Sequence, residues 1–323
     1  MLVVISLGRA ALLGGGDPPG FEARGGHVAS TARVIGDIAR HHRVVLTHAI
    51  GPQVGLLGLQ GALGSREAHG YTLDVLGAGA EGLVGYLLQQ ALANELRDQE
   101  IVTVLTQVVV DPEDPAFRSP AKAVGPPLAE EDAGRLVAER GWKVTPTPEG
   151  LRRVVPSPEP YAVVELRTIR RLVTAGVLVV CGGPGIPVAV DADGTLRGVE
   201  AVIDTDRSAA LVATLLGADV LLLLTDVPAV IGGWGTDSPH PLHEVTPEVL
   251  RSMTFDNATM APKVRAACRF VEATGRRSAI GAVADAPMLL AREVGTQVEA
   301  AANGHDRPGA LLLGGSQGWP WEP

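Results

Sequence analysis

The run Leu2-Val3-Val4-Ile5-Ser6-Leu7, followed directly by Gly8, introduces the pattern that decides the fold. It is short, apolar and rich in β-branched residues, which is typical of a strand buried on both faces. Similar runs recur along the chain at 43–47, 101–110, 177–181, 220–225 and 278–283. The sequence therefore predicts a series of buried strands.

Segments with helical periodicity separate these runs. One apolar stripe consists of Leu83, Leu87, Leu88, Ala91 and Leu92, and another of Val264, Ala267, Cys268 and Val271. Strands that alternate with amphipathic helices predict parallel βαβ units with right-handed crossovers. We predict an α/β protein in which helices flank a central, mostly parallel sheet. Ligands of such sheets bind at the carboxyl ends of the strands.

One stretch interrupts the alternation. Between Asp111 and Pro160 the chain is rich in Pro, Gly and charged residues, with short possible strands near Lys143 and at 152–155. Because both flanks continue the sheet pattern, we predict a single domain over 1–298 with a small protruding subdomain at 112–160. The tail at 299–323 is predicted to be partly disordered.

The composition restricts the classes of partner. Only 3% of the residues are aromatic, which gives little material for stacking on single-stranded nucleic acid. A formal charge of −9 without any Lys/Arg block also argues against a nucleic-acid partner. The apolar runs are too short to cross a bilayer and no leader precedes the first strand, so we expect a cytoplasmic protein. Neither the two cysteines nor the scattered histidines predict a metal site.

Lysine is rare, because only Lys122, Lys143 and Lys263 occur among 27 basic residues. Lys122 and Lys263 lie in segments punctuated by Pro and Gly. Lysine carries a compact charge that can follow a moving phosphoryl group, whereas arginine forms a rigid fork. From the residues alone, Lys263 is either a ligand contact or a solvated lysine at a helix start. Asp206 is either a functional carboxylate or a simple helix cap.

Glycine-bearing loops follow several of the predicted strands, at 8–11, 48–52 and 182–185. Such loops let backbone N–H groups converge on an anion. Each loop is weak evidence by itself, because glycine commonly serves only to make a turn. The phosphate-binding signature GxxxxGK[ST] is absent, and so are protein-kinase and nucleophile-elbow signatures.

Taken in order, the motifs resemble those of carbamate kinase, within the amino-acid-kinase fold, over roughly residues 2–298. The matching segments are Thr106-Gln107-Val108-Val109-Val110-Asp111-Pro112-Glu113-Asp114-Pro115-Ala116-Phe117 with Lys122 and Gly125-Pro126, Arg152-Arg153-Val154-Val155-Pro156-Ser157-Pro158, Gly198 to Asp204, Leu224-Thr225-Asp226-Val227 and Pro262-Lys263-Val264. This resemblance implies a three-layer fold and a homodimer paired through the N-terminal half. It also implies direct, in-line transfer between ATP and carbamate, giving ADP and carbamoyl phosphate, with Mg²⁺.

The resemblance also implies roles for individual residues. Lys263 would lie near the nucleotide phosphates, Lys122 would reach in from the subdomain, and Asp206 would orient the basic groups; Arg9 is a further catalytic candidate. The expected substrate and phosphate contacts are Gly8, Ala10, Ala49, Ile50, Gly51, Gly182, Gly183, Gly185 and Thr205. The expected nucleotide contacts are Thr225, Asp226, Val227, Ile231, Met260 and Lys263.

Several loops depart from the family pattern. The family reads Gly-Gly-Asn-Ala at 8–11, His-Gly-Asn-Gly at 48–51, four glycines at 182–185, Asp-Lys-Asp at 204–206, Asp-Gly-Val-Tyr at 228–231 and Gly at 261. Here Arg9, Ala10, Ile50, Pro184, Thr205 and Ala261 stand among the replacements. Two hypotheses follow. Either Arg9 replaces the charge missing at Thr205 in an active kinase, or the chain is a non-catalytic nucleotide- or metabolite-binding protein. A kinase for another small carboxylic acid is a variant of the first.

Overall fold

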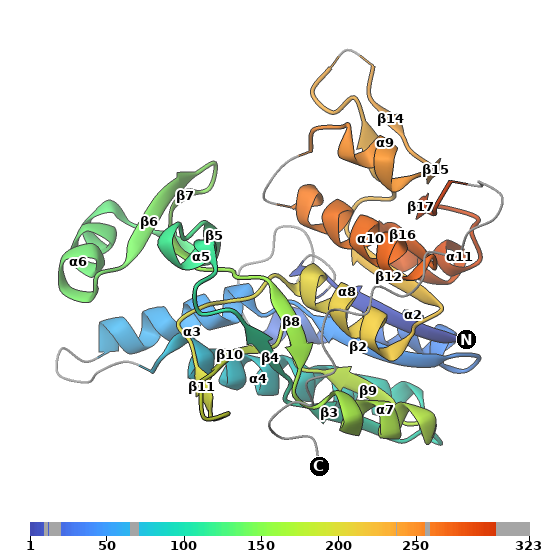
Figure 1. The fold of residues 1–323 in the computed structure, drawn as a ribbon, viewed down its shortest axis with the longest axis horizontal. Helices are drawn as coiled ribbons and strands as arrows, with labels where there is room; N and C mark the ends of the chain where they lie inside the picture. Colours follow the sequence, from blue (N-terminus) through green and yellow to red (C-terminus); the bar gives the residue numbers. More distant parts are fainter. Residues whose placement is uncertain (10–11, 13–20, 65–70, 237, 256–258, 302–323) are drawn as a thin grey trace.

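The structure is a computed structural model that describes residues 1–9, 12, 21–64, 71–236, 238–255 and 259–301. Its centre is an eight-stranded sheet in the order β15-β17-β16-β12-β1-β2-β9-β3 (Figure 1). Neighbouring strands are parallel except for β16 and β17. The strands are β1 (Leu2–Leu7), β2 (Arg43–His48), β3 (Ile101–Val104), β9 (Leu178–Cys181), β12 (Val220–Thr225), β15 (Glu244–Val245), β16 (Arg277–Ala282) and β17 (Thr296–Val298).

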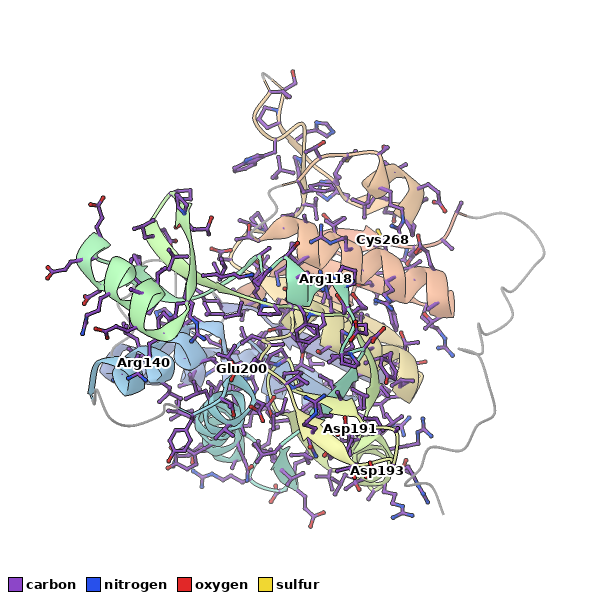
Figure 2. The ribbon with its side chains drawn as sticks, turned by 60° about the vertical axis from the view of Figure 1, so that its left-hand side comes forward. Arg118, Arg140, Asp191, Asp193, Glu200 and Cys268 are labelled. Carbon is purple, nitrogen blue, oxygen red and sulfur yellow. The ribbon has the colours of Figure 1, made fainter. Side chains whose placement is uncertain are left out.

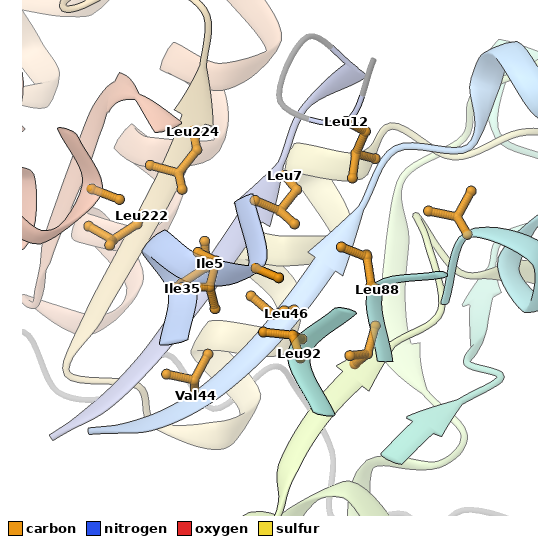
Figure 3. Close-up of a cluster of buried hydrophobic side chains, with 14 of the residues drawn as sticks. Ile5, Leu7, Leu12, Ile35, Val44, Leu46, Leu88, Leu92, Leu222 and Leu224 are labelled. Carbon is orange, nitrogen blue, oxygen red and sulfur yellow. The ribbon is translucent and has the colours of Figure 1, made fainter. Parts of the chain in front are cut away.

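Helices cover both faces of this sheet, which confirms the predicted three-layer α/β fold. Side chains of a strand alternate between faces, so Val3, Ile5 and Leu7 of β1 enter one core while Leu2 and Val4 enter the other. The first core is closed by α2 (Phe21–Ala39), α3 (Gly51–Gly64), α4 (Leu73–Glu95) and α11 (Ala286–Leu290), and the second by α7 (Leu166–Thr174), α8 (Thr205–Leu216) and α10 (Met260–Thr274). Figure 3 shows the first core.

The apolar run at 101–110 differs from the prediction, because it forms two strands instead of one. It breaks at Leu105 and Thr106, so that β3 stays in the central sheet and β4 (Gln107–Val110) enters a second sheet. That sheet has the order β11-β10-β4-β8, with β8 (Pro160–Val163), β10 (Ile186–Val190) and β11 (Leu196–Gly198). Thr106 turns the chain because its Oγ1 donates to the carbonyl of Val104, which lies only two residues earlier (2.9 Å).

A small three-stranded antiparallel sheet projects from the side of the molecule in Figure 1. It has the order β5-β7-β6 and carries two helices. The elements are α5 (Pro115–Arg118), β5 (Lys122–Leu128), α6 (Glu130–Arg140), β6 (Lys143–Thr147) and β7 (Gly150–Val155). All of them fall within the subdomain predicted at 112–160.

The subdomain rests on α3 through two glycines. A Cβ at Gly55 would lie 2.0 Å from Cα of Gly125, and Gly125 itself has φ of +74°. The absence of side chains at both positions therefore lets the backbone of β5 touch helix α3.

Between β12 and α10 the chain adds a small hairpin, β13 (Ile231–Gly232) with β14 (His240–Pro241), and a short helix, α9 (Pro247–Arg251). A 3-10 turn, Val283–Asp285, follows β16. Within the described residues, no helix is long and apolar enough to span a bilayer. Most of the tail predicted to be disordered (302–323) lies outside the described residues.

Both cysteines are buried and free. Cys181 ends β9 and Cys268 lies on α10 (Figure 2). Burial raises the pKa of the Cys181 thiol to about 12 and that of Cys268 to about 11. Neither thiol is therefore a reactive thiolate near neutral pH.

Candidate functional site

The amino end of α8 organises a cluster of charged residues. Asp204 caps this helix, because its Oδ1 accepts from the backbone N–H groups of Asp206 (3.1 Å) and Arg207 (3.4 Å). Aspartate is a favoured cap since it satisfies N–H groups that lack a partner in the first turn. The cap predicted as an alternative for Asp206 therefore belongs to Asp204, and the Asp206 side chain is left for another role.

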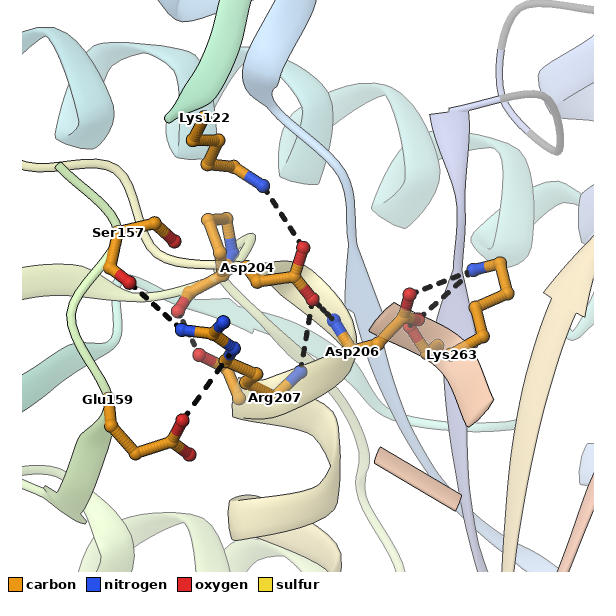
Figure 4. Close-up of polar contacts among 10 residues, drawn as sticks. Lys122, Ser157, Glu159, Asp204, Asp206, Arg207 and Lys263 are labelled. Carbon is orange, nitrogen blue, oxygen red and sulfur yellow. Dashed lines mark hydrogen bonds and ion pairs between the residues drawn. The ribbon is translucent and has the colours of Figure 1, made fainter. Parts of the chain in front are cut away.

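Lys122 reaches this helix end from the protruding subdomain. Its Nζ lies 3.1 Å from Oδ2 of Asp204 (Figure 4). Burial by itself would raise the pKa of Asp204, but Lys122, Arg207 and Lys263 together hold it below its ordinary value. Asp204 is thus an ionised carboxylate that fixes the amino end of α8 and docks the subdomain lysine on it.

Lys263 approaches from the other side, at the start of α10. Its Nζ lies 3.0 and 3.1 Å from the two carboxylate oxygens of Asp206. The two side chains are only 8% and 9% exposed, and Oγ of Ser6 on β1 donates to Oδ1 of Asp206 (2.9 Å). Lys263 is therefore not a solvated lysine. A Cβ on Gly8 would lie 3.2 Å from the same Nζ, so this glycine makes room for the ammonium group.

A network of two arginines and Glu159 ties helices α8 and α10 to the base of the protruding subdomain. Arg207 on α8 donates from Nη1 to the carbonyl oxygen of Ser157 (2.9 Å) and lies 3.6 Å from Glu159 (Figure 4). Arg269 on α10 also pairs with Glu159. The helices that carry Asp206 and Lys263 are thereby tied to the segment that closes the subdomain.

The glycine loop after β9 lies next to this cluster, but its N–H groups point into the protein. Gly182 donates to the carbonyl of Val104 (2.9 Å), Gly183 to Nε2 of His48 (3.2 Å) and Gly185 to the carbonyl of Gly182 (3.2 Å). These three N–H groups are therefore engaged within the protein in this conformation, and their expected contact with an anion stays a prediction. Pro184 fits the arrangement, because its carbonyl accepts from Oγ of Ser208 on α8.

His48 supports the same loop from the end of β2. It is fully buried, and burial lowers its pKa to about 4. The imidazole is therefore neutral at physiological pH, and its Nε2 serves as the acceptor for Gly183. Ile50, 2% exposed, packs against Gly183 from the neighbouring loop. His48 therefore acts here as a neutral, hydrogen-bonded support of the glycine loop.

The expected nucleotide contacts lie at the carboxyl end of β12, at the start of β13 and at the amino end of α10. Thr225 ends β12 and donates from Oγ1 to Oδ1 of the exposed Asp226 (3.0 Å). Val227 and Ile231 follow on the segment that leads into β13, while Met260 and Lys263 begin α10. Strand carboxyl ends and helix starts are where α/β sheets bind ligands.

The first loop is described only in part. Arg9 is exposed and Ala10 lies outside the described residues. Burial lowers the pKa of Arg152 on β7, Glu149 raises it, and the nearby charge of Arg9 lowers it further. Arg9 therefore lies within electrostatic reach of the subdomain. Within the described part of the chain, no hydrogen bond or ion pair ties its guanidinium to the glycine loop.

Among the remaining candidates, Thr205 is half-buried in the first turn of α8, Ala49 lies between β2 and α3, and Gly51 begins α3. Sequence reasoning did not assign Asp204, Ser6, Glu159 or Glu81 to the site. Asp204 stood in a recognised motif, but Ser6 and Glu81 sit inside apolar patterns that gave no signal.

The described residues offer two cations, each held by a carboxylate, on opposite sides of one helix end. No group of three or more His, Cys, Asp or Glu side chains in the described ranges is arranged to hold a metal ion. The two lysines held in this way suit neutralisation of a phosphoryl group, since preorganised cations stabilise its equatorial oxygens.

Comparison with known proteins identifies relatives of the chain. The model of the amino acid kinase family matches residues 1–281. A carbamate kinase of Rhizobium meliloti (strain 1021) is 45% identical over 300 residues, covering 92% of each chain. A solved structure from Aeropyrum pernix K1 gives a TM-score of 0.87 at 36% identity, covering 93% of this chain and all of that one. A carbamate kinase from Giardia lamblia bound to AMP-PNP gives 0.85 at 34% identity, covering 93% and 98%.

Proposed function

The chain belongs to the carbamate kinases of the amino acid kinase family, and we propose that it transfers a phosphoryl group directly between ATP and carbamate. In the direction of ATP synthesis, a β-phosphate oxygen of ADP forms a new bond to the phosphorus of carbamoyl phosphate. The bond from that phosphorus to the carbamate oxygen breaks, and carbamate leaves with the electron pair. No proton has to move at the reacting oxygen, so no general base is required.

The observation that carries this proposal is the pair of lysine–aspartate contacts on α8. Lys122 and Lys263 come from different parts of the chain and meet the helix end from opposite sides. We infer that Lys263 binds the nucleotide phosphates and that Lys122 binds the acceptor-side oxygens of the transferring group. Asp204 and Asp206 hold the two lysines in place before substrate arrives, which reduces the reorganisation needed at the moment of transfer.

We infer that Mg²⁺ enters with the nucleotide, as MgADP or MgATP. The two nearby aspartates already pair with lysines, so they offer no spare charge for a resident ion. Magnesium binds through phosphate oxygens and water with only one or two carboxylates. A metal carried by the substrate therefore fits these residues better than a permanent protein site.

We infer that two copies of the chain form a homodimer through the N-terminal half. Strand β3 is the outermost strand of the central sheet among the described residues. Tyr86 on α4 and Leu105 beside β3 are 60% and 49% exposed, and with Thr103 and Gln89 they line one shallow depression. Exposed apolar side chains beside this outermost strand suit contact with a second copy.

The test of the reaction is ATP formation from MgADP and carbamoyl phosphate. We expect turnover by the natural chain, and a loss of about 10²–10³ in kcat for Lys263→Ala or Lys122→Ala, the magnitude typical of deleting one preorganised charge. Lys143→Ala is the matched control, because Lys143 is exposed on β6, and it should retain activity. Absence of turnover together with thermal stabilisation by nucleotide would favour the binding-protein alternative.

Arg9→Ala in the same assay tests whether Arg9 makes up for the lysine absent at Thr205. A loss comparable to that of Lys122→Ala would support this compensation. Full activity would refute it and would leave Lys122 and Lys263 as the cations of the reaction.

A further inference from the structure

Glu81 is a buried acidic residue to which neither the sequence nor the proposed reaction assigns a role. It lies in the middle of α4 and is 0% exposed. No ion pair joins it to a cation within the described residues. Carboxylates are almost never fully buried unless they are paired. Its position therefore calls for an explanation.

The carboxyl group of Glu81 is pressed against the glycine loop after β9. A Cβ on Gly182 would lie 2.1 Å from Oε2 of Glu81, and one on Gly183 would lie 3.1 Å from its Cγ. Only glycine at these two positions allows so close an approach. The Glu81 side chain is therefore in direct contact with the loop backbone at Gly182 and Gly183.

Thr106 connects Glu81 to the loop a second time. Its backbone N–H donates to Oε2 of Glu81 (3.2 Å), and its Oγ1 accepts from the backbone N–H of Gly182 (3.1 Å). The other carboxyl oxygen, Oε1, is buried without a hydrogen-bond partner among the described residues. If Glu81 were ionised, Oε1 would be a buried, negatively charged acceptor without a hydrogen-bond donor. The protonated acid carries no such charge.

The groups around Glu81 favour its uncharged form. Burial raises the pKa of Glu81 well above its ordinary value, against the N–H groups of Thr106 and Gly185, and the negative charge of Glu165 raises it further. The other titratable groups on the surrounding elements are Cys181 at the end of β9 and His48 at the end of β2. Both are neutral at physiological pH, so neither compensates a negative charge.

We propose that Glu81 is a positioning residue for the transfer reaction: its uncharged carboxyl group holds the Gly182–Gly185 loop in the conformation that the structure shows, next to the two lysine–aspartate pairs, and ionisation of that group releases the loop. This inference rests on the proposed function only for its consequence for turnover. The protonation state of Glu81 and its effect on the stability of the fold do not depend on the proposed function.

The first test needs no activity. A carboxyl group with a raised pKa in the folded protein binds a proton that the unfolded chain has lost, so stability falls as pH rises above the unfolded value. Glu81→Gln, which cannot ionise, should match the natural chain in Tm near pH 4 and exceed it by a margin that widens towards neutral pH. Infrared difference spectra of the two proteins should show a protonated carboxylic acid at neutral pH that is absent from the variant. A constant Tm margin, or no such band, overturns the proposal.

The second test is the pH profile of kcat. We expect kcat of the natural chain to decline at alkaline pH as Glu81 ionises, and we expect Glu81→Gln to keep activity at neutral pH and to lose this decline. Glu165→Gln removes the neighbouring charge that raises the pKa of Glu81 and should move that decline to lower pH. Superimposable profiles for the natural chain and Glu81→Gln contradict the positioning role. If neither protein turns over, the proposed function fails, while the stability and infrared results still decide the state of Glu81.

Discussion

At the scale of single residues, the site depends on which buried groups carry charge. Asp206 and Lys263 are buried as a pair with Ser6 as a third partner, so each compensates the other. Removal of one member leaves an unpaired buried charge, which costs more than the pair itself contributes. His48 and Glu81 are buried without ion partners, and for them the neutral form is favoured. The glycine loop therefore rests on two neutral titratable groups, while α8 is surrounded by charged ones.

The burial of His48 predicts a pH dependence of stability. Its pKa of about 4 in the folded chain lies below the ordinary 6.5, so the unfolded chain binds the extra proton first as pH falls. The stabilisation is complete above pH 6.5 and is lost as pH falls towards 4, with a total of about 3 kcal/mol at about 1.4 kcal/mol per pKa unit. Urea unfolding between pH 7 and 4 should show this loss.

His48→Gln keeps an acceptor at the position of Nε2 but cannot take up a proton. We expect a shallower decline of stability with acid in this variant than in the natural chain. His240→Gln is the control, because His240 is exposed on β14 and its substitution should leave the slope unchanged. Equal slopes for His48→Gln and the natural chain would contradict a neutral buried imidazole.

At the scale of elements, the junction between α3 and β5 decides where the subdomain sits. Lys122 begins β5, three residues before Gly125, and Gly125 touches Gly55 on α3. The position of Lys122 over α8 therefore depends on a contact between two backbones. Sequence patterns give no sign of such a contact, because a glycine in an apolar helix looks like an ordinary interruption.

Gly55→Ala should disrupt this junction. The new Cβ would lie 2.0 Å from Cα of Gly125, so β5 must move away from α3. Overpacking of this kind costs about 1–3 kcal/mol, and displacement of Lys122 should lower kcat as well. Urea denaturation and the ATP-formation assay measure the two effects.

Gly61→Ala on the same helix provides the matched control. A Cβ at Gly61 would meet nothing within 4 Å. Alanine is favoured over glycine within a helix by about 0.5–1 kcal/mol, so this variant should gain stability and keep its activity. If Gly55→Ala behaves like Gly61→Ala, the close contact does not position the subdomain.

At the scale of the whole molecule, the central sheet brings the two lysines together. Lys122 and Lys263 lie in different halves of the chain, and each approaches α8 from its own element. The network of Arg207, Glu159 and Arg269 joins these elements near the base of the subdomain. Strand β3, beside the patch proposed for the dimer, lies at the opposite end of the sheet order from β15.

The proposed dimer predicts a mass in solution twice the 33.4 kDa of one chain. Tyr86→Arg places a charge in the exposed patch beside β3 and should shift the protein towards monomer, as measured by light scattering at several concentrations. Val249→Arg is the control, since Val249 is a similarly exposed apolar residue on α9, and it should remain dimeric. A monomeric natural chain, or a Tyr86→Arg variant as dimeric as the control, would contradict this interface.

Sequence by itself determined the alternation of strands and helices, since the period of apolar residues is a local property. It also determined the family, because ordered motifs such as Leu224-Thr225-Asp226-Val227 and Pro262-Lys263-Val264 persist in the chain itself. Tertiary structure decided the rest, since burial and partners depend on residues far apart in the chain. Only the fold shows that Asp204 is the cap and Asp206 the partner of Lys263, that the run at 101–110 splits at Thr106, and that the N–H groups of the glycine loop are engaged within the protein. The neutral state of Glu81 is likewise decided by the tertiary structure, because only packing against Gly182 removes its carboxyl group from water.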